Sequence, residues 1–315
     1  MKGKQPNIIY YIINFVRYIY PKFLCRIMTN RILSKAEKRA DFDYILDRVN
    51  YYNKLDDSFS LEQEGIKIKD FSFFQKIKSA YFFDTYEYVR FFPVVNRFSY
   101  KFGDVTYIPS VPSILKSRPV DGDNRNSVLL NLNKRRHFVF LDDKIPFRKK
   151  DNKIIFYAFI HGKPHRIKFM EKYFEHPECI CGAVDSNKSI PKEWIVKKIG
   201  LRKHLIHKFI LALEGNDVAT NLKWIMSSNS LAVMPKPKYE TWFMEGRLIP
   251  DFHYVEIKDD YSDLIERMNF YIENPVEAEK IIKNANEYIS QFKNKKREKI
   301  ISLLVLQKYF SKSFK

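Results

Sequence analysis

The sequence predicts an α/β protein built around a parallel sheet, and two observations support this. From about residue 153 onward, short runs rich in Ile, Val, Leu and Phe alternate with helical patterns. Strands that alternate with helices form parallel sheets covered on both faces. The 315 residues are also 45% hydrophobic and 16% aromatic, which excludes a disordered chain and suffices for one large domain or two medium ones.

The second half of the chain carries the alternating elements. Apolar runs bounded by polar or turn residues predict strands at 154–160, 179–184, 209–213, 231–234 and 253–257. Helical spacing and start signals predict helices at 166–174, 192–199, 219–228, 261–273 and from Pro275 to about 292.

The first half is less regular. Asp41–Leu55 has an amphipathic helical pattern, whereas Ala80–Phe83 and Val105–Ile108 are predicted strands. The charged segment 142–152, which contains Pro146, is the best candidate linker. The expected parts are an N-terminal domain with a basic, aromatic first helix (1–150), a nucleotide-binding domain (151–292) and a basic, apolar C-terminal helix (293–315).

The formal net charge of +19 is concentrated at the two ends. Residues 1–40 hold nine Lys or Arg residues against one Glu, and residues 290–315 hold eight against one. A nucleic-acid enzyme would more often spread basic residues around its cleft. Basic ends mixed with aromatic and aliphatic residues are typical of attachment to an anionic membrane surface. We therefore expect a membrane surface, and no nucleic acid, as a partner.

Two terminal segments could provide this attachment. Ile8–Ile27 is rich in Ile, Tyr and Phe, but Pro21 and three basic residues interrupt it before it reaches the roughly 18 apolar residues of a membrane span. It also lacks the cleavage site of a signal peptide. Lys299–Phe310 is a second apolar helix with basic flanks. Each segment is expected to be either an interfacial helix or a helix packed on the protein.

The cysteines indicate a reducing compartment. Cys25, Cys179 and Cys181 are sparse and odd in number, which argues against a disulfide framework. Together with the missing signal peptide, this predicts a cytoplasmic protein. His176 lies near two of the cysteines, but a fourth ligand is missing. We therefore expect no metal and no cofactor.

The stretch from Lys208 to Glu256 carries the strongest functional signal. The apolar run 209–213 ends in a polar loop, and a helical pattern follows at once. In an open parallel sheet, ligands bind at the carboxyl ends of the strands, where a helix N-terminus offers N–H groups to an anion. The candidate binding residues here are Glu214, Asn216, Asp217, Val218, Ala219, Thr220, Asn221 and Lys223.

A second loop, Pro235–Glu245, is expected to reach the same edge. It would bring Tyr239, Glu240 and Trp242 beside the phosphate-binding turn. Glu240 is suited to accept hydrogen bonds from ribose hydroxyls, or else to favour a helix start through its charge. Trp242 could stack on a base or sugar, or else lie in the core. The sequence thus predicts a nucleotide-sugar site.

Several separated blocks resemble glycosyltransferase family 90, which includes bacterial lipopolysaccharide core transferases, fungal capsule-associated xylosyltransferases and animal protein O-glucosyltransferases. The blocks follow the family's order over roughly residues 81–292. They are Lys116–Pro119, Gly122–Asn124, Arg136–Phe138, Gly162–Arg166, Glu214–Lys223, Ser228–Leu231, Tyr239–Phe243 and Pro250–Val255. The resemblance implies a GT-B fold, in which two Rossmann-like domains face each other across a cleft. It also implies inverting, metal-independent transfer from a nucleotide sugar.

The chain departs from the family pattern at two places near the expected diphosphate. The family often has Arg where His161 precedes Gly162, and the animal members have Arg where Asn221 stands. Both changes remove a positive charge. Such a site must stabilise the departing diphosphate with cations and helix N-termini. The candidate cations are Lys163, Arg166 and Lys223; the alternative is that Arg166 and Lys223 are solvated surface charges.

The general base should be a carboxylate in the N-terminal domain. In the animal members an Asp directly follows an Arg in the block matching Lys116–Pro119, but Pro119 takes that place here. Asp123 is therefore the first candidate and Asp121 the second. Arg118 could orient the acceptor or bind phosphate, or else form a surface ion pair.

The sequence thus leads to a cytoplasmic transferase, peripheral on the inner face of the inner membrane. It would move a hexose from UDP-glucose or a related UDP-sugar to a lipopolysaccharide core or another lipid-linked glycan. One alternative is a non-catalytic basic protein that binds membrane or nucleic acid. Another is a transferase of the same fold that modifies protein.

Overall fold

The computed structural model describes residues 7–61, 64–74, 77–185, 187 and 189–314. They form two compact units, each made of segments that are separate in sequence. Unit 1 contains residues 137–237 and 246–291, and unit 2 contains residues up to 136 together with 238–245 and 292–314. The division therefore falls at residue 136 rather than near 150, and two later segments return to unit 2. This corrects the expected continuous boundaries.

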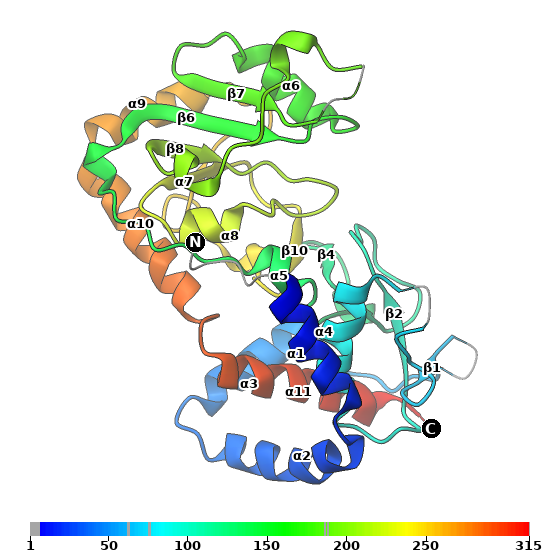
Figure 1. Ribbon diagram of the computed structural model, residues 1–315. Helices are drawn as coiled ribbons and strands as arrows, with labels where there is room; N and C mark the ends of the chain where they lie inside the picture. Colours follow the sequence, from blue (N-terminus) through cyan, green and yellow to red (C-terminus); the bar gives the residue numbers. More distant parts are fainter. Residues whose placement is uncertain (1–6, 62–63, 75–76, 186, 188, 315) are drawn as a thin grey trace. The chain divides into compact units, whose positions relative to one another are not determined.

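Unit 1 is built on a parallel sheet whose described strands have the order β11-β9-β8-β6-β7 (Figure 1). The strands are β6 (Asp151–Ala158), β7 (Cys179–Ala183), β8 (His207–Leu211), β9 (Leu231–Met234) and β11 (Val255–Glu256). Ile154 of the central strand β6 pairs with Cys179 on one side and Phe209 on the other. The alternating pattern of the second half correctly predicted this parallel sheet.

Helices cover the sheet of unit 1 and enclose its core. They are α6 (Pro164–Tyr173), α7 (Leu201–His204), α8 (Leu222–Met226), α9 (Leu264–Glu273) and α10 (Pro275–Ser290), with 3-10 turns η2 (Phe147–Lys149) and η3 (Lys192–Trp194). Buried side chains of the strands pack with Phe169 of α6, Leu264 of α9 and Ile281 of α10. The helix expected over 192–199 is only the turn η3, and the one over 219–228 is shortened to α8.

Unit 2 combines helices with a small mixed sheet. Its helices are α1 (Asn7–Ile19), α2 (Lys22–Glu37), α3 (Phe42–Tyr52), α4 (Ser79–Val89) and α11 (Lys295–Lys312), with the turn η1 (Asn124–Asn126). The sheet has the order β1 (Ile66–Lys67), β2 (Arg97–Lys101), β3 (Ser113–Leu115) and β5 (Ser127–Leu129). A separate antiparallel pair joins β4 (Ser117–Pro119) to β10 (Tyr239–Thr241). The described chain passes between the units at 136/137 in α5 (Lys134–His137), at 237/238, at 245/246 in η4 (Glu245–Arg247) and at 291/292.

The C-terminal helix α11 lies in the core of unit 2. Its apolar side chains from Ile300 to Leu306 are largely buried, and it packs against α2, α3 and α4 (Figure 1). The hydroxyl of the buried Tyr309 donates to the carbonyl of Pro112 at 2.7 Å. Of the two readings left open for this segment, the structure therefore selects a helix packed on the protein. In the described part of the chain, no helix has the length and apolar composition to cross a bilayer.

Two strands predicted in the first half are wrong. Residues 80–83 belong to α4, which is buried on most of its circumference, so its apolar residues show no helical period in the sequence. Residues 105–108 form no strand. The N–H and C=O of Val105 pair with the side-chain hydroxyl of Ser117, at 3.1 Å and 3.2 Å, instead of with a neighbouring strand.

Candidate functional site

The candidate donor site lies in unit 1, at the carboxyl ends of β6, β7 and β8. Because these strands are adjacent and parallel, the loops that follow them emerge at the same edge of the sheet. The loop after β6 is 159–163, the loop after β7 begins at 184, and the loop after β8 is 212–221. The expected placement of the 214–221 stretch at a strand end is therefore confirmed.

Arg166 ties two of these loops together. It stands in the first turn of α6, which Pro164 starts. Its Nη1 donates to the carbonyl oxygen of Phe159 at 2.7 Å, in the loop after β6. Its Nε and Nη2 donate to the carbonyl oxygens of Glu214 and Leu213 at 2.8 Å and 2.7 Å, in the loop after β8. The guanidinium is thus held at the strand ends by backbone alone.

These contacts leave part of the guanidinium available. An arginine has five N–H donors, and the three carbonyls engage one on each nitrogen. Within the described residues, Arg166 forms no salt bridge. Burial lowers the pKa of Arg166 to about 10, and the charges of Tyr261, Asp185 and Glu214 offset only part of that effect. Arg166 is therefore cationic at neutral pH, half-buried and short of a counter-charge, which is the state that favours binding an anion.

Asp185 holds the loop that carries His161 and Gly162. Its Oδ2 accepts from the backbone N–H groups of Ile160 at 3.0 Å and His161 at 2.7 Å. Gly162 has φ of +66°, a conformation that side chains with a Cβ rarely adopt, and a Cβ there would meet nothing within 4 Å. The glycine is therefore required by the turn and not by crowding. The exposed ring of His161 contacts Ser189 Oγ at 3.1 Å.

Two further side chains join the loops after β6 and β8. The ammonium of Lys163 donates to the side-chain oxygen of the exposed Asn216. His165 Nε2 lies 2.8 Å from the carbonyl oxygen of Glu214, the same oxygen that Arg166 binds. The structure therefore brings Lys163 and Arg166, two of the three candidate cations, to the same place.

The rest of the 214–223 stretch is more enclosed than expected. Asp217, Val218 and Ala219 are buried, and Asn221 donates its side-chain N–H to the carbonyl of Leu211 at 2.9 Å. Thr220 is half-buried. Lys223 is completely buried, so the alternative that it is a solvated surface lysine is wrong. Because α8 has only five residues, its N-terminus is a weaker anion site than the predicted longer helix.

Most of the loop 235–245 belongs to unit 2. Residues 239–241 form β10, which pairs with β4 of unit 2 and sets Glu240 opposite Arg118. Arg118 Nε donates to Glu240 Oε1 at 2.8 Å, and both side chains are at most 1% exposed. The hydroxyl of Tyr51 donates to the other carboxylate oxygen. A ribose contact by Glu240 would therefore require this buried pair to open.

Trp242 is part of the core of unit 2. Its ring stacks on Tyr52 with centroids 3.9 Å apart and planes 9° apart. Its Nε1 donates to Glu298 Oε2 at 2.6 Å, and Glu298 also accepts two hydrogen bonds from Arg48 at 2.5 Å and 3.0 Å. These fully enclosed contacts favour the alternative that Trp242 is a core residue.

The two candidate bases lie on the surface of unit 2. Asp121 and Asp123 are exposed on either side of Gly122. Asp123 caps η1 through the N–H of Arg125 at 3.1 Å and also pairs with its guanidinium at 2.8 Å. These hydrogen bonds lower the pKa of Asp123. While the ion pair holds, Asp123 is a weaker base than an ordinary aspartate.

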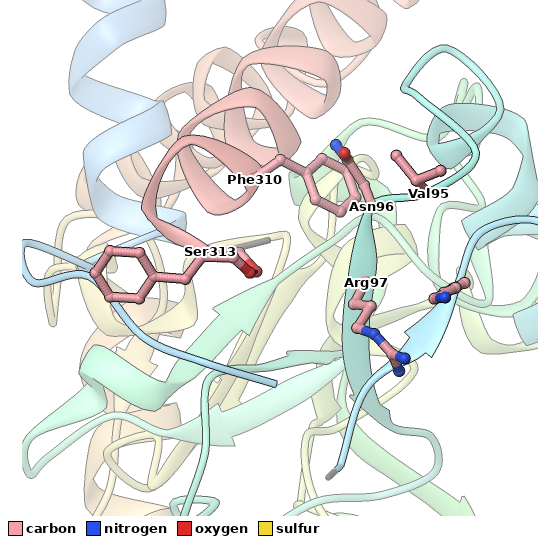
Figure 2. A pocket seen from close by; sticks show the side chains of 7 residues that line it. Val95, Asn96, Arg97, Phe310 and Ser313 are labelled. Carbon is pink, nitrogen blue, oxygen red and sulfur yellow. The ribbon is translucent and has the colours of Figure 1, made fainter. Parts of the chain in front are cut away.

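Unit 2 also contains a pocket of about 470 Å³ that holds none of the predicted site residues. The residues that line it include Asn96 and Arg97 at the start of β2, and Phe310 and Ser313 near the end of the chain (Figure 2). Arg97 is already bound to the carbonyl of Gly65 at 2.8 Å. The other residues that line the pocket are Lys67, Val95 and Phe314.

The sequence reasoning missed Asp185, Tyr51 and Glu298. Asp185 follows the predicted strand 179–184 directly, so its place at a strand end was a usable signal. Tyr51 and Glu298 gave no such signal, because their partners Glu240 and Arg48 are 189 and 250 residues away in sequence. Cys179 and Cys181 are buried on β7, and among the described residues no group of three or more His, Cys, Asp or Glu could hold a metal.

Comparison with known proteins matches the sequence to a family. The model of "Glycosyl transferase family 90" matches residues 142–312. The chain is 44% identical over 276 residues to "O-glucosyltransferase LpsA" of Dichelobacter nodosus, covering 88% of this chain and 85% of the relative. It is also 27% identical over 163 residues to "Protein O-glucosyltransferase 3" of Homo sapiens, covering 48% of this chain and 31% of the human protein.

These matches span unit 1 and its predicted donor site, and they favour an enzyme over a non-catalytic basic protein. The blocks identified in the sequence, the parallel sheet behind them and the matched relatives all lead to the same conclusion. The chain belongs to glycosyltransferase family 90 and is a glycosyltransferase.

Proposed function

We propose that this protein transfers a hexose from UDP-glucose or a related UDP-sugar to a lipopolysaccharide core or a similar surface glycan. The name of the Dichelobacter nodosus relative supports a glucosyl donor, because that protein is called an O-glucosyltransferase and is 44% identical over most of both chains. The observation that carries the proposal is Arg166, a half-buried cation fixed at the strand ends with two N–H donors left over.

The positive charge of Arg166 could stabilise a nucleoside diphosphate as it leaves the sugar. As the bond between the sugar C1 and the β-phosphate oxygen breaks, its electron pair stays on the diphosphate and negative charge develops there. A prepositioned cation stabilises that charge without having to reorganise. Lys163 is bound to Asn216 in the neighbouring loop and would supply a second positive charge. In the proposed reaction these two side chains replace a divalent ion.

The acceptor oxygen would attack C1 from the face opposite the diphosphate, which inverts the configuration. A carboxylate must take the proton of the attacking hydroxyl. Asp123 and Asp121 remain the candidates for this general base, and they differ in whether an ion pair must first break. Asp123 would first have to leave Arg125, because that pair lowers its pKa. Asp121 is exposed.

The proposal includes a GT-B arrangement, with unit 1 as the donor domain and unit 2 as the acceptor domain. The parallel sheet of unit 1 and the separate sheet of unit 2 support it. It also includes a cytoplasmic location at the inner face of the inner membrane, where a lipid-linked acceptor would be found.

A donor screen tests the proposed function. Purified protein would be incubated with UDP-glucose, UDP-galactose, GDP-mannose and CMP-linked sugars, each with truncated lipopolysaccharide or with a polypeptide acceptor, while nucleotide release is followed. We expect release of UDP that depends on the acceptor, persists in excess chelator and yields a β-linked product from an α-linked donor. Release only with a polypeptide acceptor would support the protein-modifying alternative. No acceptor-dependent release with any donor would reject the proposal.

A further inference from the structure

The first helix of unit 2 presents a wide apolar face to solvent. Every exposed residue from 8 to 20 is Ile, Phe, Val or Tyr. At about 100° per residue, these positions span roughly 160° of the helix circumference without a charged side chain. Its most exposed members, at 53–69%, are Ile8, Ile12, Phe15, Val16 and Ile19.

The opposite side of α1 fixes this orientation. The hydroxyl of the buried Tyr10 donates to Asp84 of α4 at 2.9 Å. Tyr18 packs on Tyr86 of α4 with ring centroids 5.0 Å apart, and Arg17 pairs with Glu87 at 3.0 Å. Because the polar and aromatic side of α1 is bonded to α4 (Figure 1), the apolar side cannot turn inward without breaking these contacts.

The next helix, α2, also exposes apolar side chains, and it carries positive charge. Phe23 and Ile27, four residues apart, are 55% and 69% exposed. Near the C-terminal end of α2, Arg31, Lys35 and Glu37 are exposed, as is Lys38 just beyond the helix. Arg31, Lys35 and Lys38 form no salt bridge with any residue of the described chain. Exposed apolar side chains on two consecutive helices, together with cations on α2 that have no salt-bridge partner in the described chain, match the two layers of a bilayer surface, which are an acyl region and an anionic headgroup region.

We propose that α1 and the first half of α2 form a membrane-docking face that inserts its apolar band among the lipids of an anionic bilayer. The face is defined by Ile8, Ile12, Phe15, Val16, Ile19, Phe23 and Ile27. A second copy of the chain on this face would supply no anionic partner for the α2 cations, whereas anionic headgroups do. The C-terminal helix takes no part, because its apolar side chains are buried in unit 2. The inference does not depend on the donor or acceptor proposed above.

Vesicle flotation with the full chain tests this face. Vesicles of phosphatidylcholine alone and of equal parts phosphatidylcholine and phosphatidylglycerol would be compared. We expect wild-type protein to float mainly with the anionic vesicles. The triple variant Ile8→Ser/Ile12→Ser/Ile19→Ser should bind at least about tenfold more weakly, because it removes buried apolar surface.

A charge variant and a matched control separate the electrostatic part of vesicle binding from the apolar part. Arg31→Glu/Lys35→Glu should weaken binding to the anionic vesicles about tenfold or more, with little effect on phosphatidylcholine. The same change at Lys197 and Lys198, which are exposed in unit 1, should leave flotation unchanged.

An apolar control uses side chains of similar exposure elsewhere. Ile249→Ser/Val276→Ser, at 54% and 53% exposure in unit 1, should float like wild type. All variants should keep the wild-type circular dichroism spectrum, because only exposed side chains change. The proposal is wrong if wild type stays unbound with anionic vesicles, or if the triple variant floats as well as wild type. It is also wrong if wild type is a dimer in solution that the triple variant dissociates, since the face is then covered by a second copy.

Discussion

Arg118 and Glu240 form a completely buried ion pair, with Nε and Oε1 2.8 Å apart, across the antiparallel strands β4 and β10. The other nitrogens of Arg118 donate to the backbone carbonyls of Ser127 and Tyr51, at 2.8 Å and 2.7 Å. This network holds residues 238–245 in unit 2, although the chain on both sides of them belongs to unit 1.

Replacing Glu240 by Gln should therefore destabilise unit 2 strongly. The change leaves the Arg118 guanidinium buried without a counter-charge, which typically costs about 3–5 kcal/mol. Urea unfolding followed by circular dichroism would measure the loss. The control is Asp57→Asn, which removes an exposed pair with Arg125 in the same unit and should leave the unfolding midpoint nearly unchanged. Equal midpoints for the two variants would contradict a structural role for the buried pair.

Replacing Arg166 by Ala should reduce kcat/KM for the sugar donor by about 100-fold or more. Removing a single prepositioned donor to developing negative charge commonly has this effect. Arg166→Lys should recover only part of the activity, because one ammonium cannot bind three carbonyls and a diphosphate at once. Lys168→Ala, an exposed position on the same helix, should keep wild-type kinetics. A wild-type kcat/KM in Arg166→Ala would remove Arg166 from the donor site.

Replacing Gly162 by Ala should cost about 1 kcal/mol of stability, and the cause would be the backbone alone. Its φ is +66°, and a Cβ there would meet no atom within 4 Å. Gly200 is the matched control, because a Cβ there also meets nothing but its φ is −73°. Gly200→Ala should change the free energy of unfolding by less than about 0.5 kcal/mol. Similar losses at both positions would show that backbone strain is not the cause.

The stability of unit 1 should fall as the pH drops below about 6.5. Burial lowers the pKa of His204, His207 and His253 in the folded protein. Below the ordinary histidine pKa, the unfolded chain takes up protons that the folded chain does not, so acid favours unfolding. Thermal unfolding between about pH 7.5 and pH 5 would measure the slope.

One variant links this slope to a particular side chain. The ring of His204 contacts Tyr157 and Trp224 edge to face, so His204→Phe keeps an aromatic ring in place. It should flatten the decrease in unfolding temperature toward acid pH, because one group that binds a proton only when unfolded is gone. An unchanged slope would exclude His204 as a source of the pH dependence.

The parallel half of the fold could be predicted because its signals are local. The strand at 231–234 and the helix from Pro275 have the predicted positions, and Glu214 stands at the end of a strand as expected. Each depends on an apolar run or a start signal within a few residues. The strand predicted at 80–83 is wrong because the local signal there misleads. A helix that is buried on most sides, such as α4, lacks the alternation of apolar and polar residues that identifies a helix in a sequence.

Sequence was thus sufficient for the family, the parallel sheet, the loop that ends at Lys163 and the helix start that carries Arg166. It could not decide the roles of Glu240 and Trp242, because their partners Arg118 and Tyr52 are 122 and 190 residues away along the chain. Nor could it distinguish two apolar, basic terminal helices. Folding buries the apolar side chains of α11 and leaves those of α1 exposed, because only α11 is surrounded by other helices.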